Sequence, residues 1–439
     1  MRIGIPIEIA VRELDAKIWL ALNLIKDGHD VVLGRDGPHF YNVDLFEPDV
    51  MIMFGAFNHK KKRDLISMYQ SSGISVIHLD SEGGLFKDNE SYKNRVCPEP
   101  AQSVDWVYSW GPKPASIVST CRSDTKTIKT TGHPTFDLLQ KPLRNIYVKP
   151  SEDLVEKYGD YILYNTNFAH ANRRTKNKKI INTDIENINN RTDWQAYLFG
   201  KFTESIPNIL EEHDGLSVVI RPHPEENTTP YEQLFSEQKS VHVNKNLSVR
   251  PWIQGAKAVV HNGCTTGIEA ALMDKPVIAY RPRNSEFEFS LANSVSKDAE
   301  SVEELIALIE LAQDPDKFWS SFEPEFELLK EYINNLEYYS AEKISALVSE
   351  MVESSYNGNY TPRYSRRIKR SIKSMIGDQK FGQIRRTNIR DGWKHTYDNF
   401  PPMSKSELQH RVQRFSDYID TSNIQIDSIQ KIENGFLLK

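Results

Sequence analysis

Short apolar runs alternate with longer amphipathic stretches over most of this chain, and this alternation constrains its fold more than any other feature. In the first 140 residues the apolar runs predict strands, and the stretches with helical periodicity predict helices. The expected strands are Arg2–Ile9, Asp30–Gly34, Val50–Phe54, Ile74–Asp80, Trp106–Trp110 and Thr127–Thr131, and the expected helices are Arg12–Lys26 and Lys61–Tyr69. Strands that alternate with helices are typical of βαβ units, so we expect a parallel sheet covered by helices.

A second alternating series runs from Tyr161 to about residue 330, and a helical stretch over Glu325–Met351 follows it. The expected strands are Tyr161–Phe168, Leu216–Ile220, Val241–Asn244, Ala258–His261 and Pro276–Tyr280, and the expected helices are Trp194–Glu212, Thr266–Met273 and Val302–Leu311. At 439 residues the chain is too long for one ordinary core. We therefore predict an α/β protein with two Rossmann-like, doubly wound domains facing a cleft. They span residues 1–140 and 161–330, with a linker at 141–160 and an α-rich C-terminal extension at 331–439.

Composition and charge narrow the class of protein. The net charge of −5 is small for this length and argues against a nucleic-acid partner. Cys97, Cys121 and Cys264 have no paired spacing, so we expect a reducing compartment, no disulfide and no metal site. The N-terminus enters a strand without a signal-peptide segment, and no apolar run approaches the roughly 20 residues of a membrane span. The prediction is a cytoplasmic protein, either free or peripheral on the cytosolic face of the inner membrane.

The strand that ends at Ile220 is followed by Arg221, Pro222, His223 and Pro224. The two prolines restrict the backbone on both sides of the histidine, which ends the strand and fixes the polar side chains. Ligands of open α/β folds bind at the carboxyl ends of strands, so Arg221 and His223 are predicted to meet an anion such as a nucleotide phosphate. The alternatives are a plain proline-rich turn and, for Arg221, an ion pair with Glu225 or Glu226.

A second loop suited to an anion follows about forty residues later. Its strand ends at His261, Asn262 and Gly263 form a tight turn, and a helix begins near Thr265 and Thr266. Free amides at a helix N-terminus and two threonine hydroxyls form an anion site, whereas an ordinary N-cap is the alternative. Gly267 belongs to the same turn. Glu269 is predicted either to accept hydrogen bonds from ribose hydroxyls or to be a favourable first-turn carboxylate.

An acidic turn, Asp80-Ser81-Glu82-Gly83-Gly84, follows a strand in the N-terminal half. Two glycines let the backbone turn sharply and approach a ligand. A reaction at a hydroxyl needs a general base, and a carboxylate at this turn is suited to that role. An ordinary acidic turn is the alternative. No Walker A or G-x-G-x-x-G sequence is present, so ATPase and dehydrogenase activities lack their usual motifs.

An acid-glycine motif, a histidine-proline motif and a threonine pair follow one another in this order. The set resembles that of bacterial sialyltransferases and Kdo transferases, which are GT-B enzymes that use CMP-activated sugars. Residues 1–350 resemble bacterial surface-carbohydrate biosynthesis proteins, also in the segments Tyr108–Gly111, Gly132–Pro134 and Tyr164–Phe168. The resemblance implies the GT-B architecture, a base at Glu82, and contacts of His223, Thr265 and Thr266 with the donor phosphate. The family motif has two adjacent acids, but Ser81 occupies the first position here. The base therefore stays open between Glu82 and Asp80.

We thus predict a metal-independent glycosyltransferase that needs no cofactor. It would move a Kdo- or nonulosonate-type sugar from a CMP-activated donor to a surface polysaccharide or lipopolysaccharide, the acceptor being a glycan or a lipid-linked glycan. The expected donor site contains Asn167, Arg221, His223, Asn262, Gly263, Thr265, Thr266, Gly267 and Glu269. A polyol-phosphate transferase that uses CDP-glycerol or CDP-ribitol is the second possibility. A non-catalytic nucleotide-sugar-binding protein of a polysaccharide assembly complex is the third.

The C-terminal extension carries a basic segment at residues 362–394, which contains eleven Lys and Arg residues. Ile368, Ile372, Met375 and Ile376 interleave with them at near-helical spacing. Such a segment can lie on an anionic membrane surface, which would bring the protein to a lipid-linked acceptor. The alternative is a solvated basic helix that packs its apolar stripe on the body of the protein.

Overall fold

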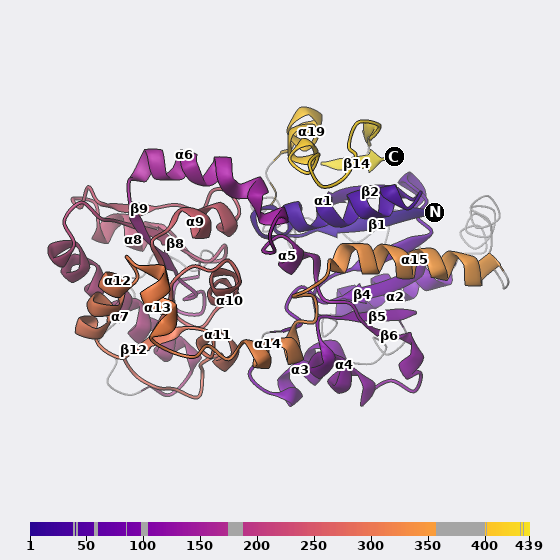
Figure 1. Cartoon of the computed structure of the whole chain (residues 1–439). Coiled ribbons are helices and arrows are strands. Elements are labelled where there is room, and N and C mark those ends of the chain that lie inside the picture. The colour runs from indigo at the N-terminus through magenta and orange to yellow at the C-terminus, as the bar shows by residue number, and fades with distance from the viewer. Residues whose placement is uncertain are drawn as a thin grey trace. The chain divides into compact units, whose positions relative to one another are not determined.

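A computed structural model describes residues 1–37, 40, 43–56, 60–84, 86–97, 104–173, 188–356, 400, 402–430, 432 and 434–439. The chain divides into two compact units (Figure 1). Unit 1 contains Met1–Leu138 and Lys330–Lys439, and unit 2 contains Leu139–Leu329. Each unit has one sheet with a doubly wound core, so the predicted pair of Rossmann-like α/β domains is confirmed.

Unit 1 is built on an eight-stranded sheet with the order β13-β14-β2-β1-β3-β4-β5-β6. Its strands are β1 (Arg2–Ile7), β2 (Asp30–Arg35), β3 (Val50–Met53), β4 (Ser75–Leu79), β5 (Trp106–Ser109), β6 (Ile128–Thr130), β13 (Ile426–Ser428) and β14 (Gly435–Leu438). The strands β1 to β6 pair in parallel. The order reverses next to β1, which has β2 on one side and β3 on the other. In a doubly wound sheet this switch point is where ligands bind.

Helices cover the sheet of unit 1. They are α1 (Ala10–Lys26), α2 (Lys60–Ser71), α3 (Asn89–Val96), α4 (Pro112–Ser119), α5 (Pro134–Asp137), α15 (Ser340–Tyr356) and α19 (Lys405–Gln413), with short 3-10 turns η1 (Val43–Leu45) and η3 (Thr125–Thr127). α15 packs against α1, the first helix of the same unit (Figure 1). Returning C-terminal residues therefore complete the core of the N-terminal domain.

This return differs from the predicted separate extension at residues 331–439. Its described part contains helices, as expected, and also a hairpin that sequence analysis did not foresee. β14 pairs antiparallel with β2, so the hairpin is added to this edge of the sheet. β14 has only four residues, Gly-Phe-Leu-Leu, and its pairing partner lies 400 residues earlier in the chain. A local pattern does not contain such a long-range pairing.

The helical stretch predicted over Glu325–Met351 is interrupted. α14 (Phe326–Tyr332) ends before residues 333–339, and α15 begins at Ser340. The buried Asp137 carboxylate accepts hydrogen bonds from Asn335 Nδ2 (2.6 Å) and from the backbone amides of Ser340 (2.8 Å) and Ala341 (2.9 Å). A carboxylate at the first amides of a helix satisfies donors that have no partner within the helix. Asp137 therefore fixes the start of α15.

The expectation that the cysteines do not pair is wrong for two of them. Cys97, at the end of α3, forms a disulfide with Cys121, which follows α4. The fold brings their Cα atoms to 6.0 Å although 24 positions separate them in the sequence. Cys264 is free. Cysteine usage therefore no longer supports a reducing compartment.

Unit 2 has a six-stranded parallel sheet with the order β12-β11-β10-β7-β8-β9. Its strands are β7 (Tyr161–Asn165), β8 (Ser217–Arg221), β9 (Val241–Val243), β10 (Ala258–His261), β11 (Val277–Tyr280) and β12 (Lys297–Ala299). Its helices are α6 (Val148–Tyr158), α7 (Arg191–Glu212), α8 (Thr229–Leu234), α9 (Val249–Gly255), α10 (Thr265–Leu272), α11 (Ser290–Asn293), α12 (Val302–Leu311) and α13 (Pro315–Ser320). The order reverses between β7 and β10, which is the switch point of this unit.

The chain passes into unit 2 earlier than the predicted linker at 141–160. Residues 143–158 form the 3-10 helix η4 (Leu143–Tyr147) and α6, and both belong to unit 2. Pro142 and Pro150 therefore mark helix starts rather than an open linker. The basic segment at 362–394 lies outside the described residues. Among the residues that are described, no helix is long and apolar enough to cross a membrane.

Candidate functional site

Three strand ends meet at the switch point of unit 2. Asn165, the last residue of β7, is in register with His261 at the end of β10 and with Arg221 at the end of β8. The loops that follow contain most of the residues predicted for a donor site. About 40 to 60 residues separate consecutive loops in the sequence, and the parallel sheet brings the loops to one edge.

A buried carboxylate fastens two of these loops together. Glu226 Oε1 accepts hydrogen bonds from Thr166 Oγ1 (2.9 Å) and from the amides of Phe168 and His223 (both 3.0 Å). Its Oε2 accepts from Tyr231 Oη at 2.7 Å. Burial raises the pKa of Glu226, and the four donors oppose that increase. The loop after β8 is therefore held to the loop after β7, which fixes His223 in place.

The contacts of His223 define its tautomer. Its Nδ1 accepts a hydrogen bond from the backbone amide of Glu225 at 3.2 Å. A neutral ring that accepts at Nδ1 carries its proton on Nε2. The proline on each side restricts the backbone here. His223 is therefore built as a fixed Nε2–H donor, a group suited to a phosphate oxygen.

The turn from β10 into α10 is shaped by a buried histidine. His261 Nδ1 accepts from the amide of Gly263 (2.9 Å), and its Nε2 lies 2.8 Å from Ser296 Oγ. Burial lowers the pKa of His261 to about 3, so the ring is neutral. Gly263 has φ 78°, which favours glycine. A Cβ at Gly267 would lie 2.5 Å from His261 Nε2, so only glycine lets the first turn of α10 sit over this ring.

The remaining loop residues lie around the start of α10. Thr265 and Thr266 are its first two residues, and the cap residue Cys264 provides no side-chain hydrogen bond to the helix amides. Thr266 Oγ1 contacts Cys264 Sγ. Asn262 Nδ2 lies 3.4 Å from the carbonyl oxygen of Asn167, so these two predicted residues are neighbours.

Asn165 was not among the residues predicted for this site. This residue is 4% exposed, and its Nδ2 has no hydrogen-bond partner among the described residues. A buried donor without an acceptor costs about 1–3 kcal/mol, so this position favours a ligand that supplies one. The signal was available in the sequence, because a polar residue ends an otherwise apolar strand.

Two residues predicted for the donor site make contacts within unit 2. The Arg221 guanidinium donates to the carbonyls of Asn246 (2.7 Å) and Leu247 (3.0 Å) and lies over the Trp252 ring. Leu247 has the left-handed φ of 62°, so Arg221 holds a constrained loop. Glu269 is buried and forms an ion pair with Arg250 at 3.0 Å, which favours a structural role over a ribose contact.

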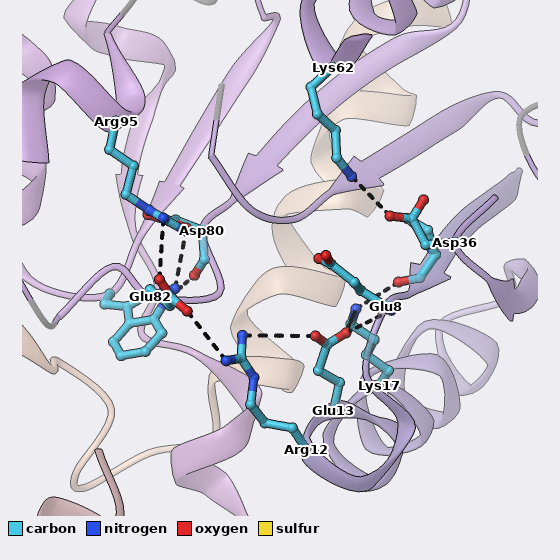
Figure 2. A network of polar contacts seen from close by, with 11 residues as sticks. Glu8, Arg12, Glu13, Lys17, Asp36, Lys62, Asp80, Glu82 and Arg95 are labelled. Carbon is cyan, nitrogen blue, oxygen red and sulfur yellow. Dashed lines mark hydrogen bonds and ion pairs between the residues drawn. The ribbon is translucent and has the colours of Figure 1, made fainter. Parts of the chain in front are cut away.

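In unit 1 the acidic turn belongs to a network of charges (Figure 2). Asp80 is 3% exposed, and Arg95 binds both of its oxygens, with Nε to Oδ2 at 3.0 Å and NH2 to Oδ1 at 2.9 Å. Burial alone would raise the pKa of Asp80, but Arg95 more than offsets this and the pKa is lowered. Glu82 is half-exposed and lies between Arg12 (3.3 Å) and Arg95 (3.2 Å).

The two glycines of this turn have a packing role. A Cβ at Gly83 or Gly84 would lie 2.9 or 2.8 Å from the ring of Trp110. The Trp110 Nε1–H also donates to the carbonyl of Asp80. The glycines therefore admit the indole against the turn, a reason that differs from the predicted approach to a ligand.

The network continues beyond the residues that sequence analysis selected. Lys17 is buried and donates to Glu13 Oε2 (2.5 Å) and to the carbonyl of Pro6 (2.6 Å). Lys62 pairs with Asp36 at 3.1 Å. These residues come from α1, α2 and the end of β2 and surround the carboxyl end of β1 (Figure 2). No cluster of His, Cys, Asp or Glu within the described residues is arranged to hold a metal ion.

Solved structures share this architecture. One is the UDP-GlcNAc 2-epimerase of Methanocaldococcus jannaschii in complex with UDP-GlcNAc and UDP. The match covers 80% of this chain and 100% of that chain, with 14% identity and a TM-score of 0.52. The Neisseria meningitidis UDP-GlcNAc 2-epimerase bound to UDP-GlcNAc matches 81% over 100%, with 15% identity and a TM-score of 0.52. A variant of the wall teichoic acid polymerase TagF matches 81% over 90%, with 9% identity and a TM-score of 0.53.

No protein-family model matches the sequence, and no curated protein matches it either. At these identities the structural matches show the fold alone. They support the GT-B architecture that the motif order had implied.

Proposed function

We propose that this chain is a glycosyltransferase of the GT-B type that moves a Kdo- or nonulosonate-type sugar from a CMP-activated donor to a bacterial surface glycan. The observation that carries the proposal is the set of donors at the switch point of unit 2. Three strand-end loops meet there, Glu226 holds the loop after β8 to the loop after β7, and the loops present the His223 ring and the N-terminal turn of α10.

The chemistry of this site fits a phosphate. His223 presents an Nε2–H, the first amides of α10 lack a side-chain cap, and Asn165 has a buried amide without an acceptor. A helix N-terminus and neutral donors stabilise an anion without a counter-ion. They would be most effective when the bond from sugar to phosphate breaks and the nucleotide gains charge.

In the proposed reaction the anomeric carbon of the sugar loses its bond to the phosphate oxygen and gains a bond to the acceptor oxygen. The bonding electrons leave with the nucleotide, and the acceptor hydroxyl loses a proton. That proton would pass to a carboxylate of the charged network in unit 1. Thr265 and Thr266 are proposed as further phosphate ligands, and no metal ion takes part.

A polyol-phosphate transferase is the second candidate. The fold of TagF favours it, since that neighbour covers most of this chain, and one of its structures was soaked with CDPG. Its donor would be CDP-glycerol or CDP-ribitol, and the bond broken would be within the diphosphate. The same loops in unit 2 would hold that diphosphate.

A donor panel separates these functions. The protein is incubated with CMP-Kdo, CMP-sialic acid, CDP-glycerol, CDP-ribitol and UDP-GlcNAc, with and without a surface-glycan acceptor, and the released nucleotide is measured. Acceptor-dependent release of CMP from a CMP-sugar supports the proposal. Release of CMP from a CDP-polyol supports the second candidate, and acceptor-independent conversion of UDP-GlcNAc would make the protein an epimerase.

A further inference from the structure

Among the residues that the structure describes, one carboxylate of the charged network in unit 1 takes part in no ion pair. Glu8 directly follows β1, at the switch point between β1 and β3 where a doubly wound sheet binds its ligands. Its backbone amide donates to Glu13 Oε2 at 3.2 Å, which fixes the start of this loop. Glu8 is exposed as a residue, although neighbouring atoms displace much of the water around its carboxyl group.

Among the described residues the Glu8 carboxylate makes no hydrogen bond or ion pair, and Figure 2 draws none to it. The charged groups around it are Lys62 from α2, Glu13 and Arg12 from α1, and Asp36 from the end of β2. Loss of water around the carboxyl raises the pKa of Glu8, Lys62 and Arg12 oppose this, and Glu13 and Asp36 add to it. A carboxylate with a raised pKa is a stronger base.

The two carboxylates predicted from sequence are less suited to take a proton. Both oxygens of Asp80 are bound by Arg95 in a buried pair. Each oxygen of Glu82 lies against a different guanidinium, Arg12 on Oε1 and Arg95 on Oε2. Both carboxylates are therefore engaged with guanidinium groups, and Arg95 lowers the pKa of Asp80 despite its burial.

A second group near this network also lacks a partner. His133 is 7% exposed, its Nδ1 accepts from the amide of Thr135 (3.2 Å), and its Nε2 has no partner among the described residues. Lys17, Glu13, Asp80 and Arg12 are its charged neighbours, and burial lowers the pKa of His133 to about 3. The ring is therefore neutral with an Nε2–H, a buried donor suited to a ligand oxygen.

We propose that Glu8, rather than Asp80 or Glu82, is the general base of unit 1, and that it takes the proton of a glycan hydroxyl at the switch point beside β1. This inference rests on the proposed function. The acceptor O–H bond breaks as the acceptor oxygen bonds to the anomeric carbon, and Glu8 becomes a neutral carboxylic acid that returns its proton to water. The nucleotide leaves with the electron pair of the broken bond. His133 would donate to another oxygen of the acceptor and position it.

The test compares Glu8→Gln with Glu82→Gln in the full chain, with the donor that wild type uses. General-base removal typically lowers the rate about 10²–10⁴-fold, so we expect a loss in kcat of that size for Glu8→Gln. Its Kd for the released nucleotide should stay within about twofold, since unit 2 binds it, and its Tm should match wild type. Glu82→Gln should lose less than about tenfold.

Variants of two neighbouring residues, Asp36 and Lys62, test the role of Glu8 through the pH dependence of kcat/KM. A purely structural role of Glu8 would not make this pH dependence shift. Activity requires ionised Glu8, so kcat/KM should fall as pH drops through its pKa. Asp36→Asn removes a negative charge that raises this pKa, and its acid limb should shift to lower pH. Lys62→Met removes a positive charge that lowers it, and its acid limb should shift to higher pH.

Each outcome has a distinct meaning. Opposite shifts in these two variants, together with an inactive but folded Glu8→Gln protein, support the proposal. A Glu8→Gln protein that keeps more than about a fifth of kcat overturns it, as do shifts in the same direction. If wild type releases nucleotide from no donor of the panel, the proposed function fails, and the role of Glu8 fails with it.

Discussion

The residues at the two switch points of this molecule differ in charge. In unit 2 the strand-end loops carry mainly uncharged groups, such as Asn165 and the threonines of α10, and the charged Arg221, Glu226 and Arg250–Glu269 pair are engaged in contacts within the unit. In unit 1 the corresponding edge carries nine charged side chains, which Figure 2 labels. The sheets have the same winding, so the difference lies in the loops.

This difference separates two kinds of chemistry. Backbone amides at a helix N-terminus, hydroxyl groups and an imidazole N–H hold an anion by hydrogen bonds. In unit 1 burial raises the pKa of Glu8, with Glu13 and Asp36 adding to the rise, whereas Arg95 lowers the pKa of Asp80 despite its burial. This difference supports the proposal that unit 2 binds the phosphate and that unit 1 takes up the proton.

The buried ion pairs give the largest expected effect. Removing one partner, as in Arg250→Met of unit 2 or Lys17→Met of unit 1, leaves a buried carboxylate and should cost about 3–5 kcal/mol of unfolding free energy. Replacing both partners by apolar residues should recover most of this loss. Urea denaturation measures both values.

The double variants test the contrast between the two units. Arg250→Met with Glu269→Met should keep nucleotide binding, because the two side chains bind each other and neither is a proposed phosphate ligand. Glu13→Leu with Lys17→Met should keep stability but lose transfer, because Glu13 holds the amide of Glu8. Loss of nucleotide binding in the first double variant would return Glu269 to the donor site.

His223→Ala tests the neutral donor of unit 2. Removing one preorganised donor to a developing anion lowers kcat about 10²–10³-fold, and we expect a loss in this range with an unchanged Tm. His242→Ala, at a partly buried histidine on the neighbouring strand β9, is the matched control and should keep its activity. Near-normal turnover of His223→Ala would remove the phosphate role of this histidine.

Most of the sheet framework could be predicted from the sequence. The expected strand Ala258–His261 and helix Val302–Leu311 have the bounds of β10 and α12. Apolar runs buried on both faces, such as β1 and β10, carry a signal that does not depend on distant contacts. The addition of β14 to β2, the Cys97–Cys121 disulfide and the cap of α15 by Asp137 all join distant segments, and no local pattern contains them.

The sites were predictable in part for the same reason. His223 and the Thr265 loop could be predicted because prolines, glycines and threonines follow strands at these positions. Glu8 has no such motif, and its isolation depends on where Lys62 and Asp36 end up in the fold. The partners of Arg221, the carbonyls of Asn246 and Leu247, are likewise fixed only by the tertiary structure.

Because His261 is buried, we expect the stability of the folded chain to depend on pH. The pKa of His261 is about 3 in the folded chain, below the ordinary value of 6.5, so the unfolded chain binds the extra proton first as pH falls. Stability should therefore drop below pH 6.5 by about 1.4 kcal/mol per pH unit from this residue. His261→Asn, which keeps an acceptor for Gly263, should lose that part of the slope. Urea denaturation at pH 6.5 and 4.5 measures it, and equal slopes in both proteins would contradict the assignment.

Arg221→Lys should have the smallest effect and decides what this arginine does. Its guanidinium spans two carbonyls of the loop after β9, and lysine cannot reproduce the planar fork. Loss of one such hydrogen bond costs about 1 kcal/mol, so we expect a Tm lower by a few degrees and a donor KM within about fivefold of wild type. A direct phosphate contact would instead lower kcat about 10²-fold or more, as for His223. A large loss of turnover with an unchanged Tm would therefore add a charge to the phosphate site and end the contrast between the two units.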